Sequence, residues 1–290
     1  MKVFVTGGSG YIGRATIRAL RLRGHDVTAL VRGERAAEVV AGLGATPVTG
    51  TLRDLDVLAS AAADADGAIH LAQERGPRVR EIDAGASGAI QDGIGAGPYV
   101  HTGGAWVYGN TNGLVGEDAP QSPPSVVAWR FDNEKRVLSR VANGGRPVLI
   151  MPGIVYGHGA GLIEQFFTGP ARTRHAVAII GDGSNHWSLV HVDDLAELYA
   201  LALDAPAGSV YAGVASADFT AAQIAEAVSR AAGCAGRVES VTVRQAREEM
   251  GPIADAFALD QQVSSARARE QLGWDPPNRD VLGEIAESAT

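Results

Sequence analysis

The chain has 290 residues, and its 33 acidic against 25 basic side chains give a formal net charge of −8. This length suffices for one large α/β domain with or without an added lobe, and the negative charge argues against a nucleic-acid partner. The single cysteine excludes an internal disulfide, and without a charged leader or a membrane-length apolar run we expect a cytoplasmic protein that does not bind membranes.

A glycine-rich turn follows the first predicted strand, Val3–Val5, and precedes a predicted helix with apolar residues at helical spacing. In this turn Gly7 permits backbone angles closed to other residues, Gly10 lets a ligand approach, and Gly13 lets helix and strand pack closely. The N-terminus of the helix favours a pyrophosphate. A purely structural turn is the alternative, but the strand–turn–helix order favours a dinucleotide site formed by Gly7, Ser9, Gly10, Tyr11, Ile12 and Gly13.

The end of the second predicted strand, Asp26–Val31, indicates which dinucleotide binds. A carboxylate at this place would hydrogen-bond the ribose hydroxyls of NAD. Arg32 stands there instead, and a guanidinium suits a 2′-phosphate. The sequence therefore predicts NADP, with NAD less favoured; the alternative is that Arg32 is an ordinary solvated residue at a helix start.

The third and fourth predicted strands add further cofactor residues. Residues 45–50 contain a proline and are typical of an edge strand. Asp54 follows, placed to accept from the adenine amino group, to cap the next helix, or to do both. The strand at 67–72 ends in Leu71 and Ala72, which leave room for the cofactor, and its His70 is interpreted as a core histidine.

A helix over 79–95 and a fifth strand at 99–102 complete the pattern that sets the fold class. Five strands alternating with helices predict an α/β fold of the Rossmann type, a doubly wound parallel sheet. In such folds, ligands bind at the carboxyl ends of the strands, so polar groups there are candidates for binding and catalysis.

The remaining sequence predicts a second, smaller unit. A loop over 110–124 is followed by a helix at 126–143 and a sixth strand at 147–151. Helices over 221–232 and 264–272 are expected to complete a small C-terminal α/β substrate lobe. The predicted boundaries are 1–150 with 188–215 for the NADP-binding domain and 151–187 with 216–290 for the lobe.

Five short motifs occur in a fixed order along the chain: Thr6–Gly13, Val107–Gly109, Pro152–Gly157, His191–Leu195 and Glu270–Trp274. Together they resemble the short-chain dehydrogenase/reductase superfamily, in its extended branch of nucleotide-sugar epimerases and dehydratases. The resemblance implies a Rossmann domain that binds NAD or NADP, with contacts that include Pro152 and Ile154, and a C-terminal substrate lobe.

The chain departs from that family at its proton-handling residues. The family pairs a tyrosine with a lysine four residues later, and the lysine holds the ribose and lowers the pKa of the tyrosine. Alignment on Glu134 puts Val126 and Arg130 in these places, and alignment on Pro120 and Pro123 puts Val127 and Phe131 there. Gly104 stands at the serine position and Asp83 at that of a helix asparagine, so the chain resembles the atypical members of the superfamily.

Arg130 would hold a ribose hydroxyl in place of the lysine but cannot donate a proton at neutral pH. The alternative is an exposed ion pair with Glu134, one helical turn further on. His101, Thr102, Tyr108 and Tyr156 are the remaining proton carriers near the strand ends; Tyr108 is the best of them, although its turn motif is also a structural one. The candidate catalytic residues are therefore Thr102, Tyr108 and Arg130, with Asp83 in support.

Three functional hypotheses follow. The first is an NADP-dependent oxidoreductase that acts on a small organic substrate through an unconventional proton relay. The second is an epimerase, dehydratase or isomerase that retains its cofactor, and the third is a non-catalytic NADP(H)-sensing regulatory protein with a protein partner. His186 and Trp187, expected to face the cleft, favour an enzyme, which we expect to act as a monomer or homodimer.

Overall fold

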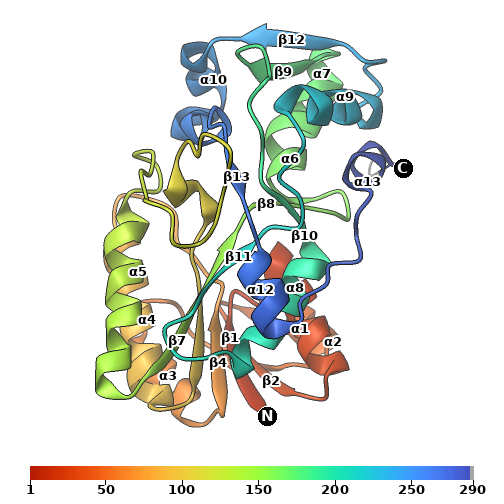
Figure 1. Cartoon of the computed structure of the whole chain (residues 1–290). Coiled ribbons are helices and arrows are strands. Elements are labelled where there is room, and N and C mark those ends of the chain that lie inside the picture. Colours follow the sequence, from red (N-terminus) through yellow and green to blue (C-terminus); the bar gives the residue numbers. More distant parts are fainter. Residues whose placement is uncertain (288–290) are drawn as a thin grey trace.

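The structure is a computed structural model, and it describes residues 1–287. Its centre is a seven-stranded sheet in which every pair of neighbouring strands is parallel (Figure 1). The strands, in sheet order, are β11 (Val210–Gly213), β7 (Arg146–Pro152), β5 (Pro98–Thr102), β4 (Gly67–His70), β1 (Lys2–Thr6), β2 (Asp26–Val31) and β3 (Thr46–Thr49). The predicted α/β, Rossmann-type doubly wound fold is confirmed.

Burial along the strands explains their order in the sheet. In β1 the side chains of Val3 and Val5 enter one core and that of Phe4 enters the other, because successive side chains of a strand point to opposite faces. β3 contains Pro47 and is mostly exposed, and it lies at the sheet edge, as the proline predicts. β11 is an additional strand that the sequence patterns did not indicate.

Helices cover both faces of the sheet (Figure 1). The helices that share one face are α1 (Tyr11–Leu22), α2 (Glu34–Gly42), α8 (Val192–Leu201) and α12 (Ala266–Leu272). Those that share the other face are α3 (Leu55–Ala63), α4 (Val79–Ile94) and α5 (Trp129–Ser139). Each face thus has its own apolar core.

Two predicted helices differ from the structure. The helix expected from residue 126 begins at Trp129, and its last part is a separate 3₁₀ turn, Arg140–Asn143. The segment over 264–272, expected in the C-terminal lobe, packs on the sheet instead. Ala268 and Trp274 lie in the core beside α1 and α8, where the Trp274 indole donates to the Asp194 carbonyl at 2.8 Å. Long-range packing, which helical spacing does not encode, decides this placement.

The lobe lies beyond the carboxyl ends of the central strands (Figure 1). Its elements include β8 (Ile154–Tyr156), α6 (Gly161–Ile163), α7 (Gly169–Arg174), β9 (Val177–Ile180), β10 (Leu189–His191), α9 (Ala221–Ala231), β12 (Val238–Val241), α10 (Val243–Met250), α11 (Ala254–Phe257) and α13 (Val281–Glu287). Short elements of the chain are η1 (Ala105–Tyr108), β6 (Leu114–Val115), η2 (Arg140–Asn143), η3 (Glu164–Thr168), η4 (Ala202–Asp204), η5 (Gly251–Ile253) and β13 (Gln262–Val263). Phe167, Trp187 and Phe257 pack against one another at the lobe centre, with ring centroids 4.9–5.4 Å apart.

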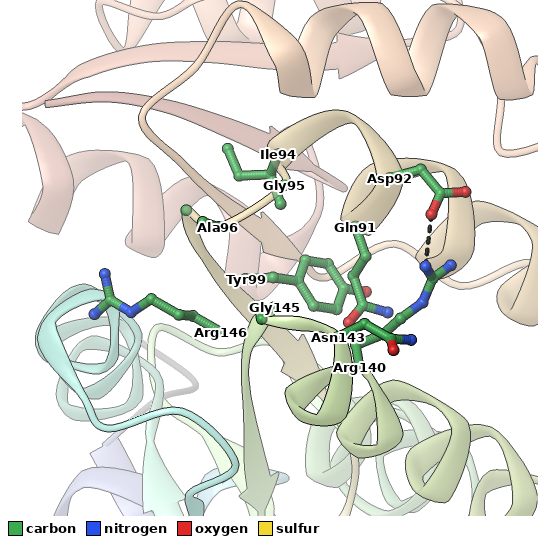
Figure 2. Close-up of a pocket in the computed structure, with 12 residues that line it drawn as sticks. Gln91, Asp92, Ile94, Gly95, Ala96, Tyr99, Arg140, Asn143, Gly145 and Arg146 are labelled. Carbon is green, nitrogen blue, oxygen red and sulfur yellow. Dashed lines mark ion pairs between the residues drawn. The ribbon is translucent and has the colours of Figure 1, made fainter.

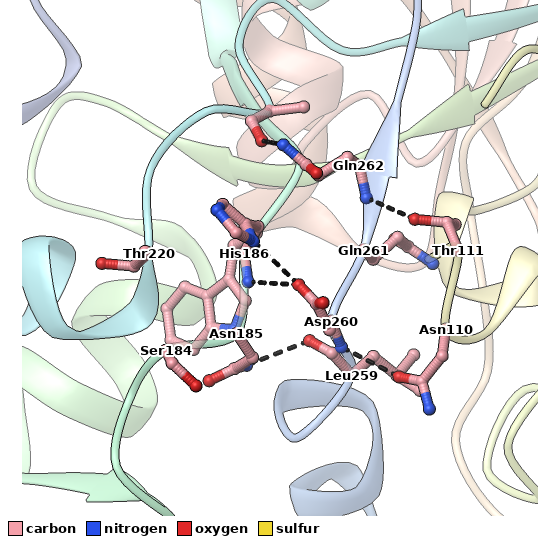
Figure 3. Close-up of polar contacts among 12 residues, drawn as sticks. Asn110, Thr111, Ser184, Asn185, His186, Thr220, Leu259, Asp260, Gln261 and Gln262 are labelled. Carbon is pink, nitrogen blue, oxygen red and sulfur yellow. Dashed lines mark hydrogen bonds and ion pairs between the residues drawn. The ribbon is translucent and has the colours of Figure 1, made fainter. Parts of the chain in front are cut away.

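A polar joint ties the lobe to the turn after β5 (Figure 3). The Asp260 carboxylate accepts from the backbone N–H of His186 at 2.8 Å, and the Asp260 N–H donates to Asn110 Oδ1 at 2.9 Å. The buried Gln261 amide donates to the carbonyls of Ala105 and Gly109 at 2.9 and 3.0 Å. These bonds fix the η1 turn, which borders the cleft described below.

Within residues 1–287, no helix has both the length and the apolar character needed to cross a membrane.

Candidate functional site

A cleft of about 650 Å³ opens between the carboxyl ends of the central strands and the lobe. Its lining joins three regions: the glycine turn Thr6–Gly13, the ends of β4, β5 and β7, and side chains from α5 and the lobe. Polar and aromatic side chains in this lining are Tyr11, Gln73, Arg75, Thr102, Trp106, Trp129, Arg130 and Gln165. The cleft is therefore the place where a cofactor on the turn would meet a substrate.

The glycine turn has the geometry of a dinucleotide site. Gly7 has φ +75°, and a Cβ there would lie 2.8 Å from the Ala72 nitrogen. A Cβ on Gly13 would lie 2.1 Å from the Gly7 carbonyl oxygen. Gly10 is the N-cap of α1 and provides no side chain to cap it, so within the described residues this helix start has no side-chain capping bond. An uncapped helix N-terminus beside a close-packed glycine backbone fits a pyrophosphate.

Most of the predicted cofactor residues line this cleft: Gly7, Gly10, Tyr11, Ile12, Gly13, Leu71, Thr102, Arg130, Pro152 and Ile154. Ser9, Arg32, Asp54 and Ala72 are not part of the lining. They lie in the glycine turn or just after the carboxyl ends of β2, β3 and β4, along the same edge of the sheet. The structure thus brings the sequence-predicted cofactor residues to one edge.

Arg32 and Asp54 differ in whether their side chains already have partners within the protein. Arg32 is exposed directly after β2, and within residues 1–287 it forms no ion pair. The Asp54 carboxylate accepts from the N–H and hydroxyl of Thr51 at 2.7 and 2.9 Å. Asp54 is the N-cap residue of α3 but makes no side-chain capping bond, so the capping interpretation is wrong. Of these two side chains, Asp54 is engaged by Thr51, whereas Arg32 has neither a side-chain hydrogen bond nor an ion pair within residues 1–287.

Arg130 reaches the cleft from the first turn of α5. Its guanidinium donates to the Thr102 carbonyl at 3.0 Å and to Gln73 Oε1 at 2.5 Å, and lies 4.7 Å from the ring centroid of Trp129. Burial lowers the pKa of Arg130 below its ordinary value, but an arginine stays charged at any working pH. The alternative of an exposed ion pair with Glu134 is wrong, because Glu134 is buried and the two side chains form no ion pair.

Glu134 is a buried carboxyl beside the cleft. It is 4% exposed, and among residues 1–287 neither of its oxygens has a hydrogen-bond partner. A Cβ built on Gly103, which lines the cleft, would lie 2.7 Å from Glu134 Oε1. Burial raises the pKa of Glu134 to about 7, opposed by the charge of Arg130 and reinforced by that of Asp83. From the sequence, Glu134 is an alignment point and a possible exposed partner of Arg130; its burial beside the cleft is not indicated there.

Glu134→Gln is expected to flatten the pH dependence of stability. The carboxyl titrates near 4.5 when unfolded and near 7 when folded, so between these values the folded protein binds the extra proton. Stability therefore falls as the pH rises from about 4.5 to 7. Glu134→Gln should remove roughly 2–3 kcal/mol of this fall in the free energy of unfolding. Urea unfolding at pH 5 and pH 8 measures it, with exposed Glu38→Gln as control; an equal pH effect in both variants would contradict the prediction.

Asp83 lies on α4, on the side of this helix that faces β4 and β5, and it does not line the cleft. Its carboxylate accepts from Asn133 Nδ2 at 3.0 Å and lies 3.5 Å from His70 Nε2 and 3.8 Å from His101 Nε2. Burial would raise the pKa of Asp83, but the two facing imidazoles and the Asn133 amide outweigh it and hold the pKa below its usual range. Burial lowers the pKa of His101 to about 3. His70 is buried, as a core histidine should be.

The hydroxyls predicted as proton carriers already have protein partners. The Tyr108 hydroxyl donates to the Glu117 carbonyl at 3.0 Å, and Tyr108 is absent from the cleft lining. Burial raises the pKa of Tyr108, which favours the structural interpretation of its motif. Thr102 lines the cleft, but its hydroxyl donates to the His70 carbonyl and lies 2.8 Å from the Tyr199 hydroxyl. Both hydroxyls are already engaged in hydrogen bonds within the protein, so neither is free to donate to a substrate oxygen.

The two aromatic residues expected to face the cleft from the lobe, His186 and Trp187, do not line it. Trp187 is buried in the lobe core and donates to the Phe257 carbonyl at 3.0 Å, and His186 pairs with Asp260 at 2.9 Å. The expectation that His186 and Trp187 face the cleft is therefore wrong, because the polar joint turns this segment toward the lobe. Trp106 and Trp129 line the cleft instead. Trp129 was missed because the predicted helix covered it without indicating which face meets the sheet.

A second cavity, of about 390 Å³, lies at the opposite edge of the sheet, at the amino ends of β5 and β7 (Figure 2). It is lined by side chains that include Gln91, Tyr99 and Arg140, and Arg140 pairs with Asp92 at 2.7 Å. Its lining includes neither the turn Thr6–Gly13 nor a carboxyl end of a central strand, so it is not the dinucleotide site.

Comparisons with known sequences agree with this geometry. The NAD dependent epimerase/dehydratase family matches residues 3–213. An uncharacterized protein of Schizosaccharomyces pombe is 30% identical over 297 residues, covering 100% of this chain and 99% of that protein. A 2-alkyl-3-oxoalkanoate reductase of Stenotrophomonas maltophilia is 29% identical, over 74% of this chain and 69% of its own.

Solved structures show the same fold. A dTDP-glucose 4,6-dehydratase from Streptomyces venezuelae, solved with NAD bound, superposes with a TM-score of 0.81 at 23% identity, covering 100% of this chain and 96% of its own. A UDP-glucose 4-epimerase from Thermus thermophilus in complex with NAD gives a TM-score of 0.80 at 22% identity, over 100% and 98% of the two chains.

Proposed function

Because the chain belongs to the NAD dependent epimerase/dehydratase family, we propose that it is an NADP-dependent oxidoreductase that reduces the carbonyl group of a small organic substrate. The observation that carries this proposal is the cleft, where the glycine turn faces aromatic and amide side chains within about 650 Å³. This volume lies in the range of small-molecule sites.

The cofactor proposal rests on two parts of the proposed dinucleotide site, one for the pyrophosphate and one for the 2′-phosphate. The glycine turn and the uncapped N-terminus of α1 would hold the pyrophosphate. Arg32, exposed and unpaired within the described chain, would bind the 2′-phosphate. The bound dinucleotide would supply the hydride. Arg130 would bind a ribose hydroxyl or substrate oxygen, since its guanidinium already faces the cleft.

The substrate class is inferred from the lining and from the relatives. Trp106, Trp129 and Ile253 offer apolar surface, and Gln73 and Gln165 offer amides. Relatives named as reductases include the 2-alkyl-3-oxoalkanoate reductase above and a 2'-dehydrokanamycin reductase of Streptomyces kanamyceticus. The Arg130 charge would stabilise negative charge developing on a carbonyl oxygen. Glu134, with its pKa near neutrality, is the buried group beside the cleft best suited to exchange the proton.

The experiment follows NADPH absorbance while purified protein is given a panel of ketones, aldehydes and enones, with product analysis in parallel. We expect substrate-dependent oxidation of NADPH that Gly13→Ala abolishes, which excludes a contaminating reductase. Substrate turnover without net NADPH consumption would identify the cofactor-retaining epimerase or dehydratase instead. Firm NADPH binding without turnover of any compound would favour the sensing protein. Gel filtration would test the predicted monomer or homodimer.

A further inference from the structure

We propose that His158, His191 and Asp193 form a binding site for a divalent transition-metal ion of the zinc class, outside the cofactor cleft. One donor atom from each of the three side chains lies within 4.8 Å of the other two. His158 Nε2 is 2.8 Å and His191 Nδ1 is 4.0 Å from Asp193 Oδ2. Two imidazole nitrogens and a carboxylate oxygen are ligands that Zn²⁺ prefers.

His191 is held ready for this role. It is buried at the N-cap of α8, where its Nδ1 accepts from the Asp193 N–H at 3.2 Å. Its Nε2 lies 2.7 Å from Glu284 Oε1. The carboxylate close to Nε2 favours the proton on that nitrogen, so the lone pair lies on Nδ1, where it now accepts from the Asp193 N–H; a bound ion would take the place of that donor. A Cβ on Gly157 would come within 2.3 Å of this imidazole, so the glycine makes the room for it.

His158 and Asp193 complete the donor set from the solvent side. Their side chains are 57% and 48% exposed, so small rotations would bring all three donors to metal distance and leave a further position open to water. His158 has φ +53°, a left-handed conformation that is uncommon for a residue other than glycine. This conformation accompanies the approach of its imidazole to Asp193.

The charge around the cluster favours a cation. Within residues 1–287, none of Asp193, Asp194 and Glu284 forms an ion pair with a lysine or arginine. The pKa of the Tyr11 phenol is raised first by burial, then by the charges of Glu284 and Asp193. The two imidazoles are the only described partners that could offset this negative charge. The pair of His186 with Asp260 at 2.9 Å has no third metal-binding donor in the part of the chain that the structure describes, and it serves as the contrasting case.

The position of the cluster gives an ion a consequence for the cleft. The Tyr11 hydroxyl donates to the Gly157 carbonyl at 2.8 Å, and both Tyr11 and Gly161 line the cleft. An ion held by His158 and His191 would clamp the loop after β8 against the start of α8. It would thereby support the face of the glycine turn that Tyr11 carries.

The test titrates untagged, chelator-treated full-length protein with Zn²⁺ alone by calorimetry, and with Co²⁺ by absorption spectroscopy. We expect one equivalent of metal and a Co²⁺ spectrum of low coordination number. His158→Ala, at an exposed side chain, should weaken binding by at least about 100-fold, and Glu284→Gln by about 10-fold, as loss of a partner behind a ligand does.

The matched control is His175→Ala, at an exposed histidine outside the cluster, which should leave the affinity unchanged. Circular dichroism would confirm that each variant folds. Absence of stoichiometric binding in the parent protein, or equal binding by the parent and His158→Ala, would overturn the proposal. Because the titration uses no NADPH and no organic substrate, its outcome is independent of the proposed reductase activity.

Discussion

Gly13→Ala is expected to abolish measurable NADPH binding and to destabilise the fold. The new Cβ would lie 2.1 Å from the Gly7 carbonyl oxygen and 2.7 Å from the Gly8 Cα, and both atoms belong to the main chain, which cannot turn aside as a side chain can. The turn and α1 must therefore separate, and the pyrophosphate site is lost. We expect affinity to fall by at least about 100-fold and the free energy of unfolding by about 3 kcal/mol.

The matched control for this change is Gly42→Ala at the end of α2, where an added Cβ meets nothing within 4 Å. Because alanine favours the helix over glycine, this variant should gain roughly 0.5–1 kcal/mol and bind NADPH normally. Fluorescence titration with NADPH and urea unfolding measure both quantities. Normal NADPH affinity in Gly13→Ala would show that the dinucleotide lies elsewhere.

Arg32→Asp is expected to reverse the choice between the two nicotinamide cofactors. In the proposed complex the guanidinium makes charge-assisted hydrogen bonds to the 2′-phosphate, each worth about 1.5–3 kcal/mol. The substitution removes them and adds a negative charge that repels the phosphate but can accept from the ribose hydroxyls of NADH. The ratio of NADPH to NADH affinity should therefore fall by at least about 100-fold.

The control for the change in net charge is Arg18→Asp, at an exposed arginine of α1, which should leave this ratio unchanged. Dissociation constants for both cofactors, measured at one fixed salt concentration, provide the test, since surface charge effects depend on ionic strength. Equal affinity of the parent protein for NADPH and NADH would refute the role proposed for Arg32.

Together the two variants separate the general dinucleotide turn from its specificity. Loss of all binding in Gly13→Ala with a changed preference in Arg32→Asp would place the whole cofactor along the carboxyl edge of β1 and β2. The reductase, epimerase and sensing hypotheses all require this site, so these variants also provide the negative controls for any activity that is found.

The sequence by itself determined the scaffold. Apolar runs bounded by turns located six of the seven central strands, Pro47 indicated the edge strand, and the spacing of Gly7, Gly10 and Gly13 indicated the close approach of α1 to β1. These features depend on local backbone preferences and on the period of burial along one element. Nearby residues in the sequence largely determine the backbone preferences and the burial period, so both can be recognised without knowledge of the fold.

Only the tertiary structure decided which side chains face the cleft. Tyr108 and Trp106 lie in one short turn, yet Trp106 borders the cleft while Tyr108 is held by the Glu117 carbonyl. Gln261, more than 150 residues further along the chain, fixes that turn through the carbonyls of Ala105 and Gly109. The burial of Glu134 likewise depends on how α5 docks on the sheet. The direction in which a side chain points depends on contacts between distant segments, which no local pattern in the sequence encodes.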